Sequence, residues 1–145
     1  MIQRIQTVWL LLATLTASAL FYTDVYHAEI ITGAVTTVLA FKVASHFPSL
    51  LLAVVVILIP FVSIFLFKNR KKQRNLIWLG VLAALAFISV NLWRISHFTT
   101  GTVPEPGGTY QVGSILPVLV LIFLFLAIRG INKDEKLVRS LDRLR

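Results

Sequence analysis

The sequence predicts an all-α membrane protein: a four-transmembrane-helix bundle with a small extracytoplasmic β-like segment and a short cytoplasmic amphipathic helix at its C-terminal end. The first observation behind this fold class is composition. Of the 145 residues 57% are hydrophobic, and the mean hydropathy is +0.85, whereas soluble domains are roughly 45–50% apolar. The second observation is that the apolar residues gather in four runs, and a membrane-crossing helix needs about 20 such residues. A single membrane domain, residues 1–145, is therefore expected.

The third observation is where the cations lie. Twelve of the 14 lysines and arginines are Arg4, members of residues 68–74, or members of residues 129–145. Lys and Arg are retained on the cytoplasmic side of membranes, which predicts cytoplasmic N and C termini and a cytoplasmic turn at 68–74. Only Lys42 and Arg94 then lie outside. This topology and attraction to anionic headgroups explain the net charge of +8, so no nucleic-acid partner is expected.

The first span is expected at residues 5–23, although its start also resembles a secretory signal. A cation, an apolar stretch at 8–15 and small residues at 17–19 are typical of a cleaved leader. The apolar run continues beyond these small residues, which favours an uncleaved span. Ala13 and Ala17 lie one helical turn apart and predict a face that another helix approaches closely.

Residues 24–46 form the first outer loop and differ in composition from the spans. β-Branched residues are dense from 30 to 43 and alternate loosely with small or polar ones. This pattern favours short strands with a turn near Gly33. An amphipathic helix lying on the membrane surface is the competing interpretation.

Three further apolar runs predict three further spans, at residues 47–67, 75–95 and 111–128. The second outer loop, at 96–110, contains a Pro-Glu-Pro-Gly-Gly stretch and is expected to be irregular. In the third span Gly80 and Ala84 predict a close contact with another helix. Trp78 and Trp93 lie near the two ends of that span, where aromatic side chains anchor a helix at the membrane interface.

The cytoplasmic tail, residues 129–145, predicts a short amphipathic helix separate from the last span. Asn132 followed by Glu135 is typical of a capping box at a helix start. Such a helix can lie on the anionic inner leaflet or dock in a groove of a partner protein. A solvated, frayed tail is the alternative, because short helices are marginal alone. The apolar residues of one helical stripe are Leu137, Val138, Leu141 and Leu144.

No constellation that carries chemistry is present in the sequence. The interiors of the four expected spans lack ionisable residues, which active transporters and proton relays place there. Cysteine, a phosphate-binding loop and a nucleophile elbow are also absent. His27, His46 and His97, with Asp24 and Glu29, share the outer side but match no zinc-ligand spacing. We therefore expect no enzyme activity, no metal and no cofactor.

Several stretches resemble an uncharacterised protein family. They are MIQRIQT at 1–7, WLLL at 9–12, KNR at 68–70, LPV at 116–118, AIRGI at 127–131, KDEKLVRS at 133–140 and DRLR at 142–145. On these motifs the chain resembles, end to end, a domain-of-unknown-function family (DUF4293 type) of small four-span proteins from Bacteroidota. The resemblance implies a protein of the bacterial inner membrane. Because the family has no assigned activity, it implies no catalytic residue.

The expected function is that of a non-catalytic inner-membrane protein, a scaffold or accessory subunit of a cell-envelope complex. A small oligomeric channel, lined by Thr and Ser of the first span, is the alternative. The expected partners are anionic headgroups at the cytoplasmic face and either another membrane protein or further copies of this chain. The residues expected to contact headgroups or a partner are Lys68, Arg70, Lys71, Lys72, Arg74, Lys133, Lys136, Leu137, Arg139, Leu141, Arg143 and Leu144.

Overall fold

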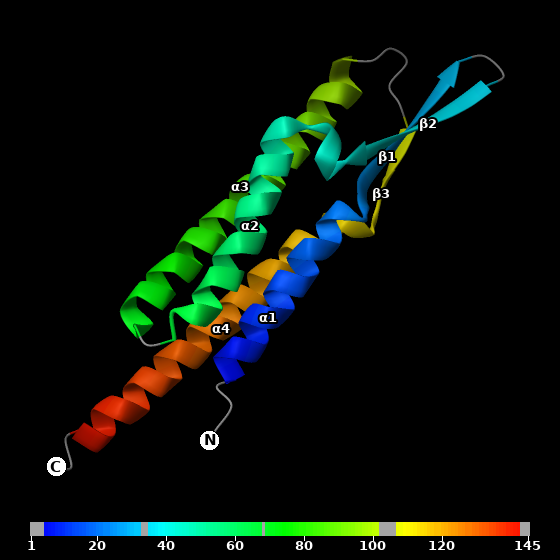
Figure 1. Cartoon of the computed structure of the whole chain (residues 1–145). Helices are drawn as coiled ribbons and strands as arrows, with labels where there is room; N and C mark the ends of the chain where they lie inside the picture. The colour runs from blue at the N-terminus through cyan, green and yellow to red at the C-terminus, as the bar shows by residue number, and fades with distance from the viewer. Residues whose placement is uncertain (1–4, 33–34, 68, 102–106, 143–145) are drawn as a thin grey trace.

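The computed structural model describes residues 5–32, 35–67, 69–101 and 107–142, and within residues 136–142 it describes the helix backbone alone. This part of the chain is mostly helical, with three short strands (Figure 1). The elements in order are α1 (Ile5–Ser18), the 3-10 helix η1 (Ala19–Phe21), β1 (Asp24–Thr32), β2 (Val35–Lys42), the 3-10 helix η2 (Val43–Ser45), α2 (Phe47–Phe65), α3 (Arg70–Gly101), β3 (Gly107–Tyr110) and α4 (Val112–Asp142).

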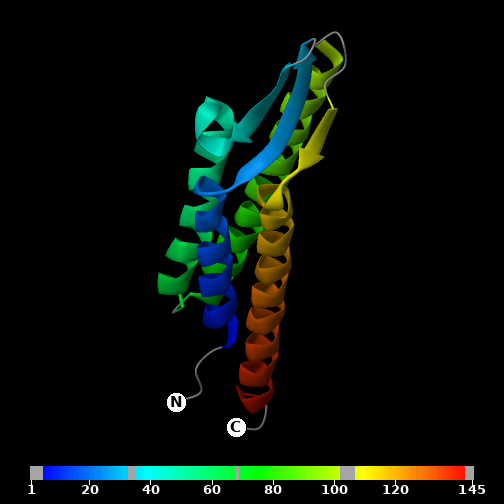
Figure 2. The same cartoon turned by 90° about the vertical axis from the view of Figure 1, so that its right-hand side faces the viewer.

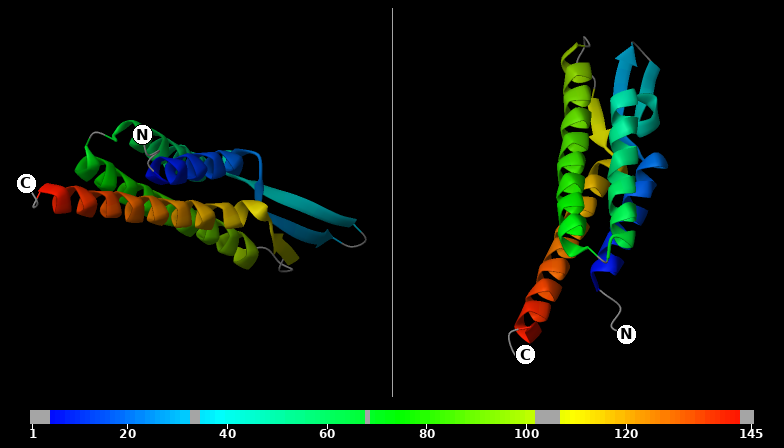
Figure 3. Two further views of the ribbon diagram at one scale, coloured as in Figure 1. Left: turned by 90° about the horizontal axis from the view of Figure 1, so that it is seen from below. Right: turned by 60° about the vertical axis from the view of Figure 1, so that its left-hand side comes forward.

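The four helices lie side by side, and each packs against two others (Figures 1 and 3). α1 packs on α4 and α2, and α3 packs on α2 and α4. The strands gather at one end of the bundle, beside the last turns of α3, and the start of α1 and the end of α4 lie towards the opposite end (Figure 2). We call these ends the sheet end and the basic end, because α3 starts at the second one with Arg70, Lys71, Lys72 and Arg74.

Three of the described helices are long and apolar enough to cross a membrane. They are Phe47–Phe65, Arg70–Thr100 and Val112–Glu135, and an 18-residue apolar window within each has a mean hydropathy of 2.7, 2.1 and 2.5 in turn. The shortest has 19 residues and therefore extends about 29 Å, close to the ~30 Å thickness of a hydrocarbon core. The apolar helical stretch at Ile5–Phe21 is shorter. Only 33–39% of each long apolar window is buried within the chain, so most of the apolar surface faces outwards, which fits a membrane protein.

Small residues let the helices approach one another. The buried positions of α1 are Gln6, Leu10, Ala13 and Ala17. The predicted close-packing face at Ala13 and Ala17 is thereby confirmed. At Gly80 of α3, a Cβ atom would lie 2.8 Å from Cγ2 of Ile59 and 3.5 Å from Cδ1 of Leu124. Glycine at this position therefore allows α2 and α4 to lie close to α3, as the sequence predicts.

The sheet confirms the strand interpretation of residues 24–46. β1 pairs antiparallel with both β2 and β3, in the order β2-β1-β3. Tyr26 of β1 is 6% exposed, and its ring packs edge-on against the rings of Phe41 and Tyr110. A Cβ atom at Gly108 would collide with the Tyr26 side chain, so glycine is what lets β3 lie beside β1. The turn expected near Gly33 lies outside the described residues.

Two of the expected loop boundaries are wrong. The turn expected at 68–74 is shorter, because α3 already begins at Arg70. The side-chain Oδ1 of Asn69 accepts a hydrogen bond from the backbone N–H of Lys72 (3.3 Å) and caps the helix there. The outer loop expected at 96–110 is also shorter, because α3 continues to Gly101 and β3 begins at Gly107.

The prediction of a separate tail helix within residues 129–145 is also wrong for the residues that the structure describes. α4 runs without a break from Val112 to Asp142. Gly130 does not end the helix but lies where α1 crosses it, because a Cβ at this position would be 3.3 Å from Cβ of Gln6. Asn132 and Glu135 do not form a cap, since both side chains contact α3 instead.

Candidate functional site

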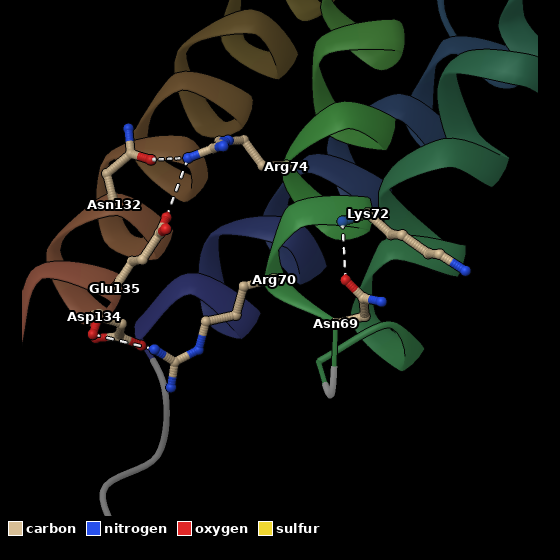
Figure 4. Close-up of polar contacts among 7 residues, drawn as sticks. All are labelled: Asn69, Arg70, Lys72, Arg74, Asn132, Asp134 and Glu135. Carbon is tan, nitrogen blue, oxygen red and sulfur yellow. Dashed lines mark hydrogen bonds and ion pairs between the residues drawn. The ribbon is translucent and has the colours of Figure 1, made fainter. Parts of the chain in front are cut away.

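The charged contacts at the basic end join the start of α3 to the last third of α4. Nη1 of Arg74 donates to Oε2 of Glu135 (3.1 Å) and to Oδ1 of Asn132 (3.4 Å), as Figure 4 shows. The side chains of Arg74 and Glu135 are 34% and 20% exposed, so the ion pair is partly shielded from solvent. Nη1 of Arg70 likewise donates to the backbone carbonyl of Asp134 (3.1 Å). Arg70 and Arg74, both expected to contact headgroups or a partner, are therefore engaged within the chain.

Other cations at the basic end remain at the surface. Lys71, Lys72, Arg129 and Lys133 are all exposed, and the Lys72 side chain points away from α4 in Figure 4. Within the described residues none of these four side chains joins an ion pair or donates a hydrogen bond. Among the side chains that the structure describes at this end, these four are available to an external anion.

A groove opens on α4 beside two of these cations. It has a volume of about 450 Å³ and is lined by Phe125, Ile128, Arg129, Asn132 and Lys133. The ring of Phe125 packs edge-on against that of Trp78 on α3, with centroids 6.0 Å apart. The groove therefore combines an apolar wall with two positive charges. Sequence reasoning treated Arg129 only as part of the topology signal and did not select it as a contact residue.

The remaining predicted contact residues are not tested by side-chain geometry. Lys68, Arg143 and Leu144 lie outside the described residues. Lys136, Leu137, Arg139 and Leu141 lie on the last turns of α4, where the structure describes the backbone. Figures 1 and 2 show that these turns continue past the ends of the neighbouring helices.

Two buried amides at the basic end were missed by sequence reasoning. Gln6 of α1 and Gln73 of α3 are each 1% exposed. Nε2 of Gln73 donates to the carbonyl of Ser63 (2.9 Å), but Oε1 of Gln73 and both polar atoms of Gln6 have no partner among the described residues. Helical periodicity in the sequence could have indicated their burial. Each glutamine lies four residues before a fully buried apolar residue, Leu10 or Ile77, and therefore on the same helix face.

The sheet end holds a second polar cluster, which connects η2, α2 and α3. Nδ1 of His46 lies 2.9 Å from Oγ of Ser49, which donates to Oδ1 of the buried Asn91 (3.3 Å). Nδ2 of Asn91 donates to the carbonyl of Phe87 one turn earlier. Burial lowers the pKa of His46, and the nearby charge of Arg94 lowers it further. Asn91 thus joins two helices, which is a packing role.

Arg94 is held in place at the sheet end by three contacts. Its Nη1 donates to the carbonyl of Lys42 (3.1 Å) and its Nη2 to Oγ of Ser45 (3.0 Å). Its guanidinium carbon lies 4.8 Å from the ring centroid of Phe41. The histidines do not assemble a metal site within the described ranges, where no three His, Asp or Glu side chains group together. His27 instead contacts Asp24 (2.9 Å).

These features define the class of protein. The chain is a helical protein with three apolar helices of membrane-spanning length and a small sheet at one end. The model of the domain of unknown function DUF4293 matches residues 2–144. The chain therefore belongs to the DUF4293 family, as its terminal motifs indicated. No curated protein is similar to it in sequence.

Proposed function

We propose that this protein crosses the bacterial inner membrane four times and acts there as a non-catalytic scaffold or accessory subunit. The three long apolar helices and the apolar stretch Ile5–Phe21, which packs against two of them, support four spans. The position of Arg70, Lys71, Lys72, Arg74, Arg129 and Lys133 at one end supports cytoplasmic termini. On this proposal the sheet faces the opposite compartment.

The observation that carries the scaffold proposal is the projection of α4 beyond the other helices. α4 continues to Asp142, and its last turns extend past the start of α3 at Arg70 and the start of α1 at Ile5 (Figures 1 and 2). A short helical extension is marginal by itself, so a binding surface that receives it gives a physical reason for its length. The apolar stripe of Leu137 and Leu141 is suited to a groove of a partner membrane protein.

Topology is tested by labelling single cysteines from outside intact spheroplasts, which is direct because the chain has no cysteine. The positions are Lys71→Cys and Ser140→Cys at the basic end and Gly107→Cys at the sheet end. No atom lies within 4 Å of a Cβ added at Gly107, so this residue tolerates the change. An impermeant thiol reagent should react with the Gly107→Cys protein alone. Labelling of Lys71→Cys in intact cells overturns the proposed orientation.

Partner binding is tested by gentle solubilisation and co-purification with a tagged chain. Truncation after Lys136 removes the projecting turns but keeps Asp134 and Glu135, which contact α3. We expect this variant and Leu141→Asp to insert normally and to lose the partner. Arg139→Gln is the matched control, because it changes the net charge by the same amount on the opposite side of the helix. Retention of every partner by the truncated chain would refute a role for the projection.

The channel alternative has weaker support from the structure. The hydroxyls of Thr14, Thr16 and Ser18 donate to the backbone carbonyls four residues earlier in α1, at 2.8–2.9 Å. Their donors are therefore already used within the helix rather than turned towards a passage. A liposome flux assay with the purified protein checks this, and ion flux above that of empty vesicles would favour the channel.

A further inference from the structure

Two cations on α4 lie close enough to repel each other, and no acidic side chain among the described residues pairs with either of them. Arg129 and Lys133 are one helical turn apart and both exposed, and like charges at this spacing destabilise a helix. Within the described residues neither side chain has an acidic partner, and Glu135 is engaged with Arg74. An external anion placed between them would remove the repulsion.

The groove beside these cations also offers a neutral donor with a fixed orientation. Asn132 lines the groove, and its Oδ1 accepts a hydrogen bond from Arg74 (3.4 Å). Because the guanidinium can only donate, this contact sets the amide so that its NH₂ group is turned away from Arg74, as Figure 4 shows. The amide therefore adds a hydrogen-bond donor next to Arg129 and Lys133.

The apolar wall of the groove indicates that the ligand carries hydrocarbon as well as charge. Phe125 precedes Arg129 by one turn and packs on Trp78, and Ile128 lies in the same wall. The four residues from Phe125 to Arg129 rise about 6 Å along the helix axis. The cations thus lie where the apolar run of α4 ends, and the aromatic rings lie one turn deeper, which is the order of headgroup and chain in a lipid.

We propose that the groove binds an anionic phospholipid of the leaflet at the basic end. Its phosphate lies between the side chains of Arg129 and Lys133 and accepts from the amide of Asn132. Its glycerol and acyl chains pack on Phe125 and Trp78. This inference rests on the proposed insertion in the membrane, but it adds a specific site to the general attraction of a basic surface for anionic lipids.

The test uses the quenching of Trp78 by brominated lipid. The full chain with Trp9→Phe and Trp93→Phe retains one tryptophan, Trp78, whose ring packs on Phe125 of the groove wall. It is reconstituted in phosphatidylcholine vesicles that contain one-tenth brominated phosphatidylglycerol or one-tenth brominated phosphatidylcholine. We expect the anionic lipid to be preferred at Trp78 by about 30-fold, because the two cations each contribute an attraction of roughly 1 kcal/mol.

The matched variants separate a site from diffuse charge. The double substitution Arg129→Gln/Lys133→Gln should reduce the preference to nearly one. Lys71→Gln/Lys72→Gln removes the same charge from exposed residues at the start of α3 and should reduce the preference only by their diffuse attraction for the anionic surface, which is a smaller loss than in the first variant. An equal loss in both double variants overturns the site, as does equal quenching by the two lipids. Absence of quenching by either lipid instead overturns the membrane placement itself.

Discussion

The two ends of the molecule are held together by different forces. At the sheet end, three strands share backbone hydrogen bonds, and the ring of Tyr26 is buried between neighbouring elements. At the basic end, α3 and α4 are joined by contacts of Arg70 and Arg74, and polar atoms of two buried glutamines have no partner among the described residues. The sheet end therefore fixes the arrangement of the helices, whereas the basic end contributes less stability and is better suited to binding an external lipid or protein.

Two of the partly buried arginines, Arg94 and Arg74, show the same contrast between the two ends. Arg94 is held by a backbone carbonyl, a hydroxyl and an aromatic ring, and no carboxylate is among these contacts. Arg74 is held by a carboxylate and an amide on one neighbouring helix. Contacts to side chains of a single helix can be exchanged for an external anion more readily than contacts to backbone can.

The largest effect is expected for Tyr26→Ala at the sheet end. Truncation of a buried aromatic side chain costs about 3–5 kcal/mol, and this ring also packs on Phe41 and Tyr110. The measurement is the free energy of unfolding in detergent micelles by denaturant titration. Tyr22→Ala is the control, because Tyr22 is 91% exposed, and it should change stability by less than about 0.5 kcal/mol. Similar losses in the two variants would contradict the assignment of stability to the sheet end.

An effect of opposite sign is expected for Gln6→Leu at the basic end. The side chain is 1% exposed and neither of its polar atoms has a partner among the described residues. A buried polar group left unpaired costs about 1–3 kcal/mol, so leucine should raise the free energy of unfolding by an amount of this order. Gln73→Leu should gain less, because it also loses the hydrogen bond to Ser63. A destabilised Gln6→Leu protein would show that this amide has a partner in the membrane.

The comparison of the ends also explains what the sequence could predict. Hydropathy fixes the three long apolar helices, and the alternation of side chains identifies β1 and β2, because these signals are local. The strand β3 was missed because it depends on Gly108, whose lack of a Cβ lets the chain approach Tyr26, a contact made between distant residues.

At the basic end, contacts between distant residues also explain why the prediction of a separate tail helix was wrong. Gly130 and Asn132 are typical of helix boundaries, but Gly130 makes room for Gln6 and Asn132 binds Arg74. Their partners lie on helices far away in the sequence, so local patterns could not reveal these roles. The charges of the groove were visible in the sequence, but their position beside Phe125 and Trp78 depends on the packing of α3 on α4.

A smaller effect is expected for the ion pair between Arg74 and Glu135. Both side chains are partly exposed, and pairs of this kind contribute about 0.2–1 kcal/mol. A double-mutant cycle with Arg74→Gln, Glu135→Gln and the double variant should give a coupling free energy in this range. A coupling of several kcal/mol would mean that the basic end is as firmly fixed as the sheet end.

The smallest effect is expected from the protonation of His46 at the sheet end. Burial, and then the charge of Arg94, lowers the pKa of His46 below its value in the unfolded chain. Between these two pKa values the unfolded chain binds more protons than the folded chain does. The stability of the fold with a neutral His46 is therefore complete above pH 6.5 and is lost as the pH falls towards the folded pKa. His46→Gln should therefore reduce the loss of stability between pH 7.5 and pH 5. Arg94→Gln should reduce it less, because burial of the imidazole is the larger cause. Titration of the unfolding free energy at the two pH values measures both differences, and a larger acid sensitivity in His46→Gln would show that the sign is wrong.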